Sequence, residues 1–337
     1  MKILGIETSC DETAASIVES GTKVLSNIIA SSANLHSQTG GVVPEVAARE
    51  HSRAILPVIH QALAQAELTW NDVDAIAVTA QPGLIASLLV GVNTAQTLAY
   101  IHQKLLLPVH HIAGHIYGNF LERDIQEFQF PILVMTISGG HNELVLMKGH
   151  HEFEIIGETL DDAAGEAFDK VSRLLGLGFP GGPIISKRAE DGDPAAFDFP
   201  RVMLTKDNRF NFSFSGLKSA VRREVEKLGG TSKLSEKQVN DLAASFQLAV
   251  VETLVAKLTD AAEEYDVRAV HLAGGVSANR LLRQLAKEKL PQDLPLLWPK
   301  EMVFCTDNAA MIAGAAYFLP EKKGNWAAVR VSTQVGF

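Results

Sequence analysis

Cysteine, surplus positive charge and long apolar runs are all scarce in this sequence. Its 337 residues include two cysteines, Cys10 and Cys305, too few for a disulfide framework, so we expect a reducing, cytoplasmic setting. The formal net charge of −9 argues against a chain that holds nucleic acid unaided, because phosphate binding needs clustered lysine and arginine. The most apolar window, 82–101, contains Ser87 and Asn93, which favours a buried helix and no membrane span. The apolar run at the start is too short for a signal peptide.

The residues that are present predict a protein of α/β class. A hydrophobic fraction of 47% with 20% charged residues is typical of a globular protein, and 337 residues suffice for two domains. The expected order of the first half is three strands, helix, strand, helix and strand. These elements are residues 2–8, 14–18, 24–30, 46–66, 74–79, 85–102 and 109–111.

The second half begins as the first does, with a strand, a turn of small residues and a returning strand. Its strands are expected at 132–137, 143–148, 153–157 and 269–273. Residues 160–166 are expected to enter a helix that runs to about 175, and further helices are expected at 220–228, 238–265, from about 280, and 308–318. This duplication is typical of the acetate kinase, Hsp70 and actin superfamily (the two-domain, actin-like ASKHA fold), with a ligand cleft between two strand-rich cores. The expected domains are 1–126 and 127–306, with 307–337 returning to the first.

Three histidines lie within six positions in the stretch Val109–Gly118. His111 and His115 are four residues apart, so on a helix they share one face. Their Cβ atoms, about 5–6 Å apart, would let two imidazoles reach one metal ion. A third ligand must come from elsewhere, and Asp307 is the candidate. An isolated HxxxH pair more often lines a helix start, and N-capping is the alternative role for Asp307. Ile112 after the first histidine argues against the HExxH helix of zinc proteases.

Three loops have residues suited to phosphate or a close ligand. An acidic turn, Ser9–Thr13, joins two strands, and Gly274–Asn279 places two glycines between a strand and a helix. Gly176–Pro183 is a glycine–proline loop that a ligand can approach closely. Each also has a purely structural interpretation, as a solvated turn or a tight connection, so none of them assigns a function alone.

Taken together, the motifs in these stretches resemble one known family from Lys2 to about Phe318. In the family's order they are IETSCDET (6–13), GGVVPE (40–45), HHxxGH (110–115), SGGH (138–141), DDAAGEAFDK (161–170), FSFSGLK (212–218), GGVSAN (274–279) and CTDN (305–308). The family is TsaD, the tRNA threonylcarbamoyladenosine transferase formerly called O-sialoglycoprotein endopeptidase, in its bacterial form.

The resemblance implies a reaction and a metal. The family transfers the threonylcarbamoyl group from threonylcarbamoyl-AMP to N6 of the adenosine 3′ of the anticodon, in tRNAs that read ANN codons. Carried over by motif, His111, His115 and Asp307 ligate one divalent metal ion, iron or zinc, and this ligand set does not choose between them. No catalytic side-chain base is assigned, because the mixed anhydride is already activated and the metal can act as a Lewis acid.

The resemblance also implies a site for the adenylate. The expected substrate-binding residues are Thr136, Ile137, Ser138, Gly139, Gly140, Asp169, Gly182 and Asn279. Residues 136–140 are expected to hold phosphate and carbamoyl oxygens, Asp169 and Gly182 the ribose or threonyl side, and Asn279 the adenine end. Asp11 and Glu12 match acidic positions near the site, with no role assigned. Whether ATP also occupies the site is left open.

Partners follow from the same resemblance. The family acts on tRNA and, in bacteria, works with the paralogue TsaB and the ATPase TsaE. The helices of the first domain, including the one after Pro44, are expected to face TsaB. The basic clusters at 218–223 and 280–283 are too small to hold tRNA unaided.

Three other interpretations compete with a transferase. A nucleotide phosphotransferase or ATPase of the same superfamily needs a catalytic aspartate and has no use for the histidine pair. A metalloprotease needs a glutamate directly after His111, which this sequence does not have, and a scaffold like TsaB should lack the metal histidines.

The sequence departs from the family pattern at a few positions. These are Gln81 before Pro-Gly, Ala113 between the histidines, and Asn142-Glu143 where Thr-Gln is commoner. None of them removes a proposed ligand.

Overall fold

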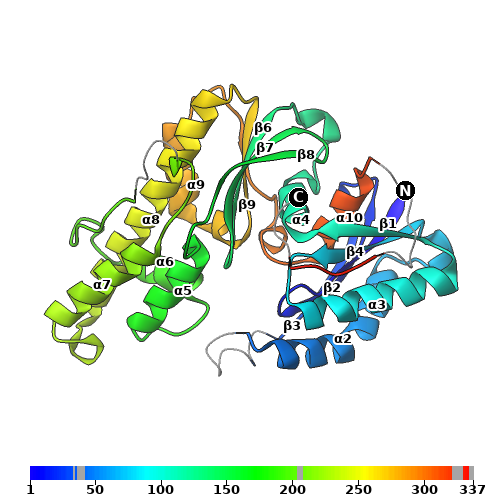
Figure 1. Cartoon of the computed structure of the whole chain (residues 1–337), viewed down its shortest axis with the longest axis horizontal. Coiled ribbons are helices and arrows are strands. Elements are labelled where there is room, and N and C mark those ends of the chain that lie inside the picture. Colours follow the sequence, from blue (N-terminus) through cyan, green and yellow to red (C-terminus); the bar gives the residue numbers. More distant parts are fainter. Residues whose placement is uncertain (33–34, 36–41, 203–207, 321–328, 334–337) are drawn as a thin grey trace. The chain divides into compact units, whose positions relative to one another are not determined.

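The computed structural model describes residues 1–32, 35, 42–202, 208–320 and 329–333. Contacts divide the chain into two compact units, each with its own five-stranded sheet (Figure 1). Unit 1 comprises Met1–Gln129, Gly149–Phe153 and Pro299–Phe337, and unit 2 comprises Phe130–Lys148 and Glu154–Trp298. Gly40 and Gly41 of the GGVVPE motif lie outside the described residues.

The sheet of unit 1 has the strand order β3-β2-β1-β4-β5. Its strands are β1 (Lys2–Glu7), β2 (Glu12–Glu19), β3 (Lys23–Ser31), β4 (Ala75–Gln81) and β5 (Leu105–His110). Its helices are α2 (Pro44–Gln65), α3 (Ile85–His102), α4 (His111–Tyr117) and α10 (Ala309–Tyr317). Because β1, β4 and β5 run parallel, their carboxyl ends meet at one edge of the sheet.

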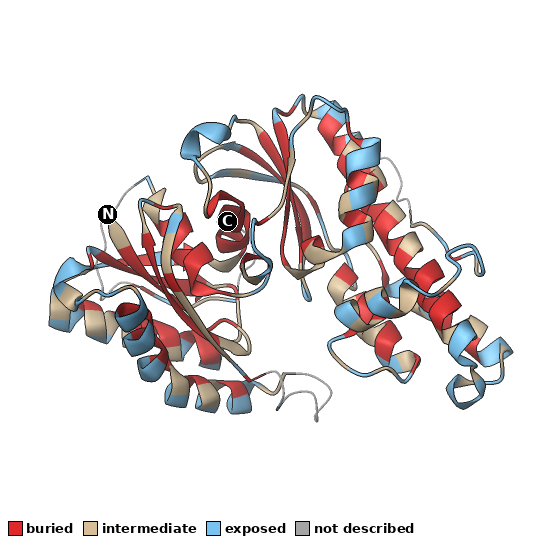
Figure 2. Ribbon diagram, turned by 180° about the vertical axis from the view of Figure 1, so that it is seen from behind, coloured by how far each residue is buried: buried red, intermediate tan, exposed pale blue. Residues whose placement is uncertain are grey.

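Alternation along β1 sends its side chains to two layers. Leu4 and Ile6 belong to the buried core that α2 and α3 form with the sheet (red in Figure 2). Gly5 faces α10, since a Cβ there would overlap the backbone O of Ala309. Glu7 follows Gly5 with the strand period of two, so its carboxylate lies on the α10 side of the sheet.

The sheet of unit 2 has the order β10-β9-β6-β7-β8. Its strands are β6 (Ile132–Ile137), β7 (Asn142–Gly149), β8 (Glu152–Glu158), β9 (Ala269–Ala273) and β10 (Leu296–Leu297). Its helices are α5 (Ala164–Leu174), α6 (Gly181–Ala189), α7 (Ser215–Lys227), α8 (Glu236–Glu264) and α9 (Arg280–Lys289). In each sheet the first strand lies between an antiparallel and a parallel neighbour, which confirms the predicted α/β duplication.

Helix α8 is the most apolar long element of unit 2. Ser235 caps it and forms a reciprocal capping box with Gln238. Within the described ranges it is the one helix long and apolar enough to cross a membrane, and 78% of its most apolar 18-residue window is buried. That apolar surface packs in the core of unit 2, with Phe246 against Phe168 of α5.

Two expected boundaries in unit 2 are wrong. The glycine–proline loop does not extend to residue 183, because α6 begins at Gly181. Pro183 lies in its first turn, where a backbone N–H has no intrahelical acceptor to lose. α7 begins at Ser215 and not at 220, because Asp161 accepts the N–H groups of Phe214 and Ser215. A cap supplied by a distant segment leaves no local sequence signal.

Candidate metal centre and substrate loops

The candidate metal centre lies at the carboxyl edge of the parallel strands of unit 1. β5 ends at His110 and α4 begins at the next residue, so His111 and His115 sit one helical turn apart. Asp307 precedes Asn308, the N-cap of α10, whose side chain accepts a backbone N–H of the first turn at 3.0 Å. The cap is therefore Asn308, and the N-capping alternative for Asp307 is wrong.

The structure brings the three predicted ligands together. Oδ1 of Asp307 lies 3.2 Å from Nε2 of His115 and 3.6 Å from Nε2 of His111. The two imidazole rings meet edge to face, with centroids 4.7 Å apart. One ligand atom from each of the three side chains lies within 4.8 Å of the others. Residues from one short helix and from the far end of the chain thus converge on one point.

Glu7 is the residue of this centre that sequence reasoning missed. Its side chain is fully buried at the end of β1 and lies 3.2 Å from Nδ1 of His111. It also accepts the hydroxyl of Thr79 and the backbone N–H of Ser9, each at 2.5 Å. A carboxylate on Nδ1 fixes the ring so that Nε2 faces Asp307. The sequence feature that could have identified Glu7 is a charged residue at the end of an otherwise apolar strand.

Charges in the centre favour its ionised forms. Burial opposes a charge on His111, but Asp307 and Glu7 outweigh it and raise the pKa of this imidazole to about 9. Burial likewise opposes a charge on Asp307, yet His111 and His115 lower the pKa of this carboxyl to about 2. The pKa of Glu7 is also lowered, because the charge of His111 prevails over burial.

The two acidic residues with no assigned role lie close to the centre. Burial, a hydrogen bond from Asp11 and the charge of Asp307 together raise the pKa of Glu12 to about 9. Burial and the charge of Asp307 also raise the pKa of the Cys10 thiol well above its usual range. The carboxyl of Glu12, which accepts from Ser31 at 3.0 Å, is therefore neutral at neutral pH. The thiol of Cys10 is not a nucleophile there.

The described residues fit a metal ion. Both ring nitrogens of His115 are buried and have no hydrogen bond within the described part of the chain, although Nε2 faces Asp307. Burying an imidazole unbonded is costly unless a further partner binds it. Two imidazoles and a carboxylate are ligands that both zinc and iron accept, with coordination positions left over.

The predicted substrate residues 136–140 form the end of β6 and the turn into β7. Ser138 closes this turn, donating its N–H to the carbonyl of His141 at 2.8 Å and accepting the N–H of His141 on Oγ at 3.1 Å. A Cβ on Gly139 or Gly140 would meet nothing within 4 Å. Thr136 is 2% exposed, and its hydroxyl has no hydrogen-bond partner among the described residues. The turn thus offers free backbone to a ligand.

Local structure already positions the other three predicted substrate residues, Asp169, Gly182 and Asn279. Asp169 accepts the N–H of Gly181 at 2.7 Å and so holds the start of α6, while burial raises its pKa. Gly182 follows, and a Cβ there would meet open space. Asn279 caps α9 through Oδ1, and its amide nitrogen donates to Gln247 at 2.8 Å.

The glycines of these loops fall into two kinds. Packing requires glycine at two positions. A Cβ on Gly165 would overlap the carbonyl of Ser138, and a Cβ on Gly274 would lie 2.5 Å from the carbonyl oxygen of Ile137. Gly274 also has φ of +81°, which favours glycine. Gly139, Gly140 and Gly182 have neither a left-handed φ nor a close neighbour, so the folded chain itself does not demand glycine there.

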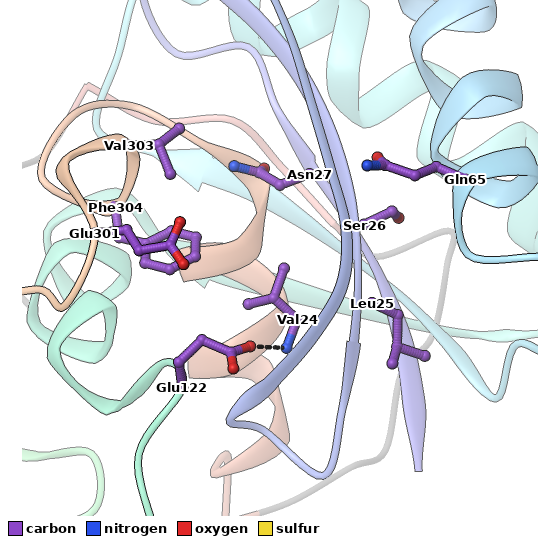
Figure 3. A pocket seen from close by; sticks show the side chains of 9 residues that line it. All are labelled: Val24, Leu25, Ser26, Asn27, Gln65, Glu122, Glu301, Val303 and Phe304. Carbon is purple, nitrogen blue, oxygen red and sulfur yellow. Dashed lines mark hydrogen bonds between the residues drawn. The ribbon is translucent and has the colours of Figure 1, made fainter.

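A separate pocket of about 390 Å³ lies elsewhere in unit 1. Nine residues line it: Val24, Leu25, Ser26, Asn27, Gln65, Glu122, Glu301, Val303 and Phe304 (Figure 3). The carboxylate of Glu122 accepts the backbone N–H of Val24 at 2.6 Å and so covers part of the outer edge of β3. None of the predicted site residues lines this pocket, so we do not assign the chemistry to it.

Solved structures share the fold of the whole chain. Component A of the (R)-2-hydroxyglutaryl-CoA dehydratase of Acidaminococcus fermentans superposes with a TM-score of 0.52 at 17% identity, covering 94% of this chain and 98% of that one. HypF of T. kodakarensis gives a TM-score of 0.60 at 15% identity, covering 94% and 47%. At such identities the likeness shows the fold alone, which is that of the actin-like ASKHA class.

The sequence comparisons are more specific. The family model for TsaD, tRNA N6-adenosine threonylcarbamoyltransferase, matches residues 23–314. A relative with that name from Thermomicrobium roseum is 51% identical over 343 residues, covering 96% of this chain and 93% of its own length. The chain belongs to the TsaD family and is a transferase that modifies tRNA, so the resemblance predicted from the motifs is confirmed. The phosphotransferase alternative is not favoured.

Proposed function

We propose that the chain transfers threonylcarbamate from threonylcarbamoyl-AMP to N6 of the adenosine 3′ of the anticodon, in tRNAs that read ANN codons. The observation that carries the proposal is the convergence of His111, His115 and Asp307 in a member of this family. We further propose domains 1–126 and 127–306, the first holding the metal and the second the adenylate, with 307–337 returning to the first. The work of this chain is to bind and orient an already activated donor.

We propose that His111, His115 and Asp307 hold one divalent metal ion, iron or zinc. When bound, such an ion supplies Lewis-acid stabilisation of charge that develops on an oxygen of the donor. In the metal-free centre the neighbouring carboxylates keep His111 protonated, so that proton must leave before Nε2 can bind. Glu7 on Nδ1 then keeps the ring oriented.

We propose that residues 136–140 with Asp169, Gly182 and Asn279 bind the adenylate. Support comes from the three glycines whose missing side chains leave open space, which allows phosphate or carbamoyl oxygens to reach backbone N–H groups. The hydroxyl of Thr136, which has no partner among the described residues, supplies one more donor. Asp169 and Asn279 act by fixing the starts of α6 and α9 as well as by any contact with the ligand. ATP is a second adenine nucleotide to test at this site.

Partners and setting are proposed on the same basis. We propose a cytoplasmic enzyme that acts with TsaB and TsaE, with α2 and α3 as the surface that TsaB covers. Large apolar side chains on these two helices are exposed, among them Leu56 at 60%, Tyr100 at 56% and Ile101 at 61%. Clustered exposed apolar residues are typical of an interaction surface. Leu56→Glu, which places a charge on this apolar surface, should weaken binding of TsaB and leave the metal content unchanged.

The decisive experiment is transfer of labelled threonylcarbamate from the adenylate to unmodified ANN-decoding tRNA, with TsaB and TsaE present. We compare the wild type with His111→Ala and Asp307→Ala. Label on tRNA with the wild type alone is the expected result and ties the transfer to the ligand cluster. A folded wild type that transfers no label, yet hydrolyses ATP in all three forms, would overturn the proposal in favour of a phosphotransferase.

A further inference from the structure

Helix α7 of unit 2 presents three cations that no described residue neutralises. Lys218, Arg222 and Arg223 form no side-chain hydrogen bond or ion pair with any residue that the structure describes. Arg222 and Arg223 are exposed and Lys218 is half-exposed. Lys218 and Arg222 are four residues apart on the helix, so they share a face, with Arg223 beside them. We call Gly216 and these three cations the α7 face.

The other basic cluster of the sequence is used within the protein. Arg283 donates to the carbonyl of Ser277 at 2.6 Å and lies over the ring of Trp298, 4.8 Å from its centroid. Arg280 lies 3.6 Å from the carboxylate of Glu190. Arg283 is therefore held within the folded chain and Arg280 has an exposed acidic partner, whereas the cations of the α7 face have no partner among the described residues and are open to an external anion.

The start of α7 is fixed by a carboxylate from another segment. Asp161 accepts the hydroxyls of Ser213 at 2.5 Å and Ser215 at 2.7 Å, together with the N–H of Phe214 at 2.9 Å. Gly216 follows and is exposed, and a Cβ there would meet nothing within 4 Å. Its φ is not left-handed, so the fold does not require glycine at this position. A rigidly held helix start with bare backbone suits close contact with a bulky ligand.

We propose that the α7 face binds the sugar–phosphate backbone of the tRNA, an inference that rests on the proposed function. The chain has a net charge of −9, so a polyanion is repelled by most of its surface and must dock where cations are unopposed. Three free cations within six positions of one exposed helix provide such a place. Contacts of this kind position the nucleic acid without reading its sequence.

The test is tRNA binding by the full-length chain, with TsaB and TsaE present, with paired charge reversals. Arg222→Glu with Arg223→Glu changes the α7 face, and Lys287→Glu with Lys289→Glu is the matched control. Lys287 and Lys289 are exposed on α9 and have no ion pair within the described residues, and both double variants change the net charge by the same amount. The Kd for unmodified ANN-decoding tRNA is measured by fluorescence anisotropy over a range of salt concentrations.

We expect the Kd of the α7 variant for tRNA to be about tenfold higher than that of the wild type at low salt. The slope of log Kd against log salt should be smaller by between one and two units. The control variant should stay near the wild type in both quantities. Equal losses in both variants would show a general charge effect and overturn the proposal. Unchanged binding by the α7 variant, or a wild type with no salt-dependent affinity, would also overturn it.

The outcome is separable from that of the proposed function. A wild type that transfers threonylcarbamate while the α7 variant binds tRNA normally would refute the α7 face and leave the transferase standing. A wild type that binds tRNA through α7 but transfers nothing would do the reverse. Normal tRNA binding with a loss of complex formation with TsaB would reassign the face to an acidic protein surface.

Discussion

The two candidate sites of this chain are built in opposite ways. In unit 1 the candidate metal centre is a set of side chains, and neighbouring residues support two of them: Glu7 fixes His111, and Asn308 takes the capping role that would otherwise engage Asp307. In unit 2 the substrate loops are backbone with side chains missing, at Gly139 and Gly140 above all. A site of the first kind fails when a side chain is removed, and one of the second kind fails when a side chain is added.

Removing a ligand of the metal centre should have the largest effect. We expect His115→Ala to lower the metal content from about one ion per chain to none and to abolish transfer, a loss beyond the roughly 10–100-fold caused by changes around a ligand. His110→Ala is the matched control, because it deletes the adjacent histidine of the same motif. Metal analysis and the transfer assay measure both. Full metal content in His115→Ala would remove this residue from the ligand set.

Changing the residue behind a ligand tests whether the centre depends on its supporting side chains. Glu7→Gln keeps the shape but removes the negative charge that lies 3.2 Å from His111 Nδ1. We expect metal affinity to fall by roughly 10–100-fold, measured by competition with a chelator. The pKa of the imidazole should also fall, since Glu7 is one of the charges that raise it, and NMR titration of metal-free protein measures this. Unchanged affinity would reduce Glu7 to a packing role.

Adding a methyl group tests the loops of unit 2. Gly140→Ala meets no neighbour within 4 Å, so we expect the free energy of unfolding to change by less than about 0.5 kcal/mol while KM for the adenylate rises several-fold. Gly165→Ala is the contrasting variant, because its Cβ would overlap the carbonyl of Ser138 and should destabilise by roughly 1–3 kcal/mol. An unaltered KM in Gly140→Ala would place the ligand away from this turn.

A buried carboxyl near the same turn gives the smallest effect on activity and a clear dependence on pH. Burial, and then the charge of Glu158, raise the pKa of Glu143 from 4.5 to about 7. Below pH 4.5 the carboxyl of Glu143 is protonated in both the folded and the unfolded protein, so it contributes nothing to the pH dependence of stability. As pH rises to 7 only the unfolded form loses its proton, so the free energy of unfolding falls, by up to about 3 kcal/mol.

Glu143→Gln should remove this loss. The variant is expected to be more stable than the wild type above pH 7, with the difference shrinking to nothing near pH 4.5. Urea unfolding at several pH values measures this. A difference that does not change with pH would show that Glu143 ionises normally in the folded protein.

The sequence predicted those features of the protein that have a regular spacing or a recognisable motif. The histidine pair has a helical spacing, and the periodic strands and helices predicted the duplicated fold. Glu7 was missed because a lone carboxylate at a strand end has no spacing partner. The start of α7 was misplaced because its cap, Asp161, comes from another segment. Contacts that depend on three-dimensional proximity alone leave no pattern along the chain.

The order in which the chain is synthesised gives the metal centre a further property. Unit 1 is discontinuous: the strands and α4 are made first, and the segment with Asp307 and α10 is added after all of unit 2. The ribosome must therefore synthesise nearly the whole polypeptide before Asp307 can meet the two histidines. A chain interrupted before Asp307 retains both histidines but cannot complete the proposed metal site, so the proposed loading with metal requires translation to pass Asp307.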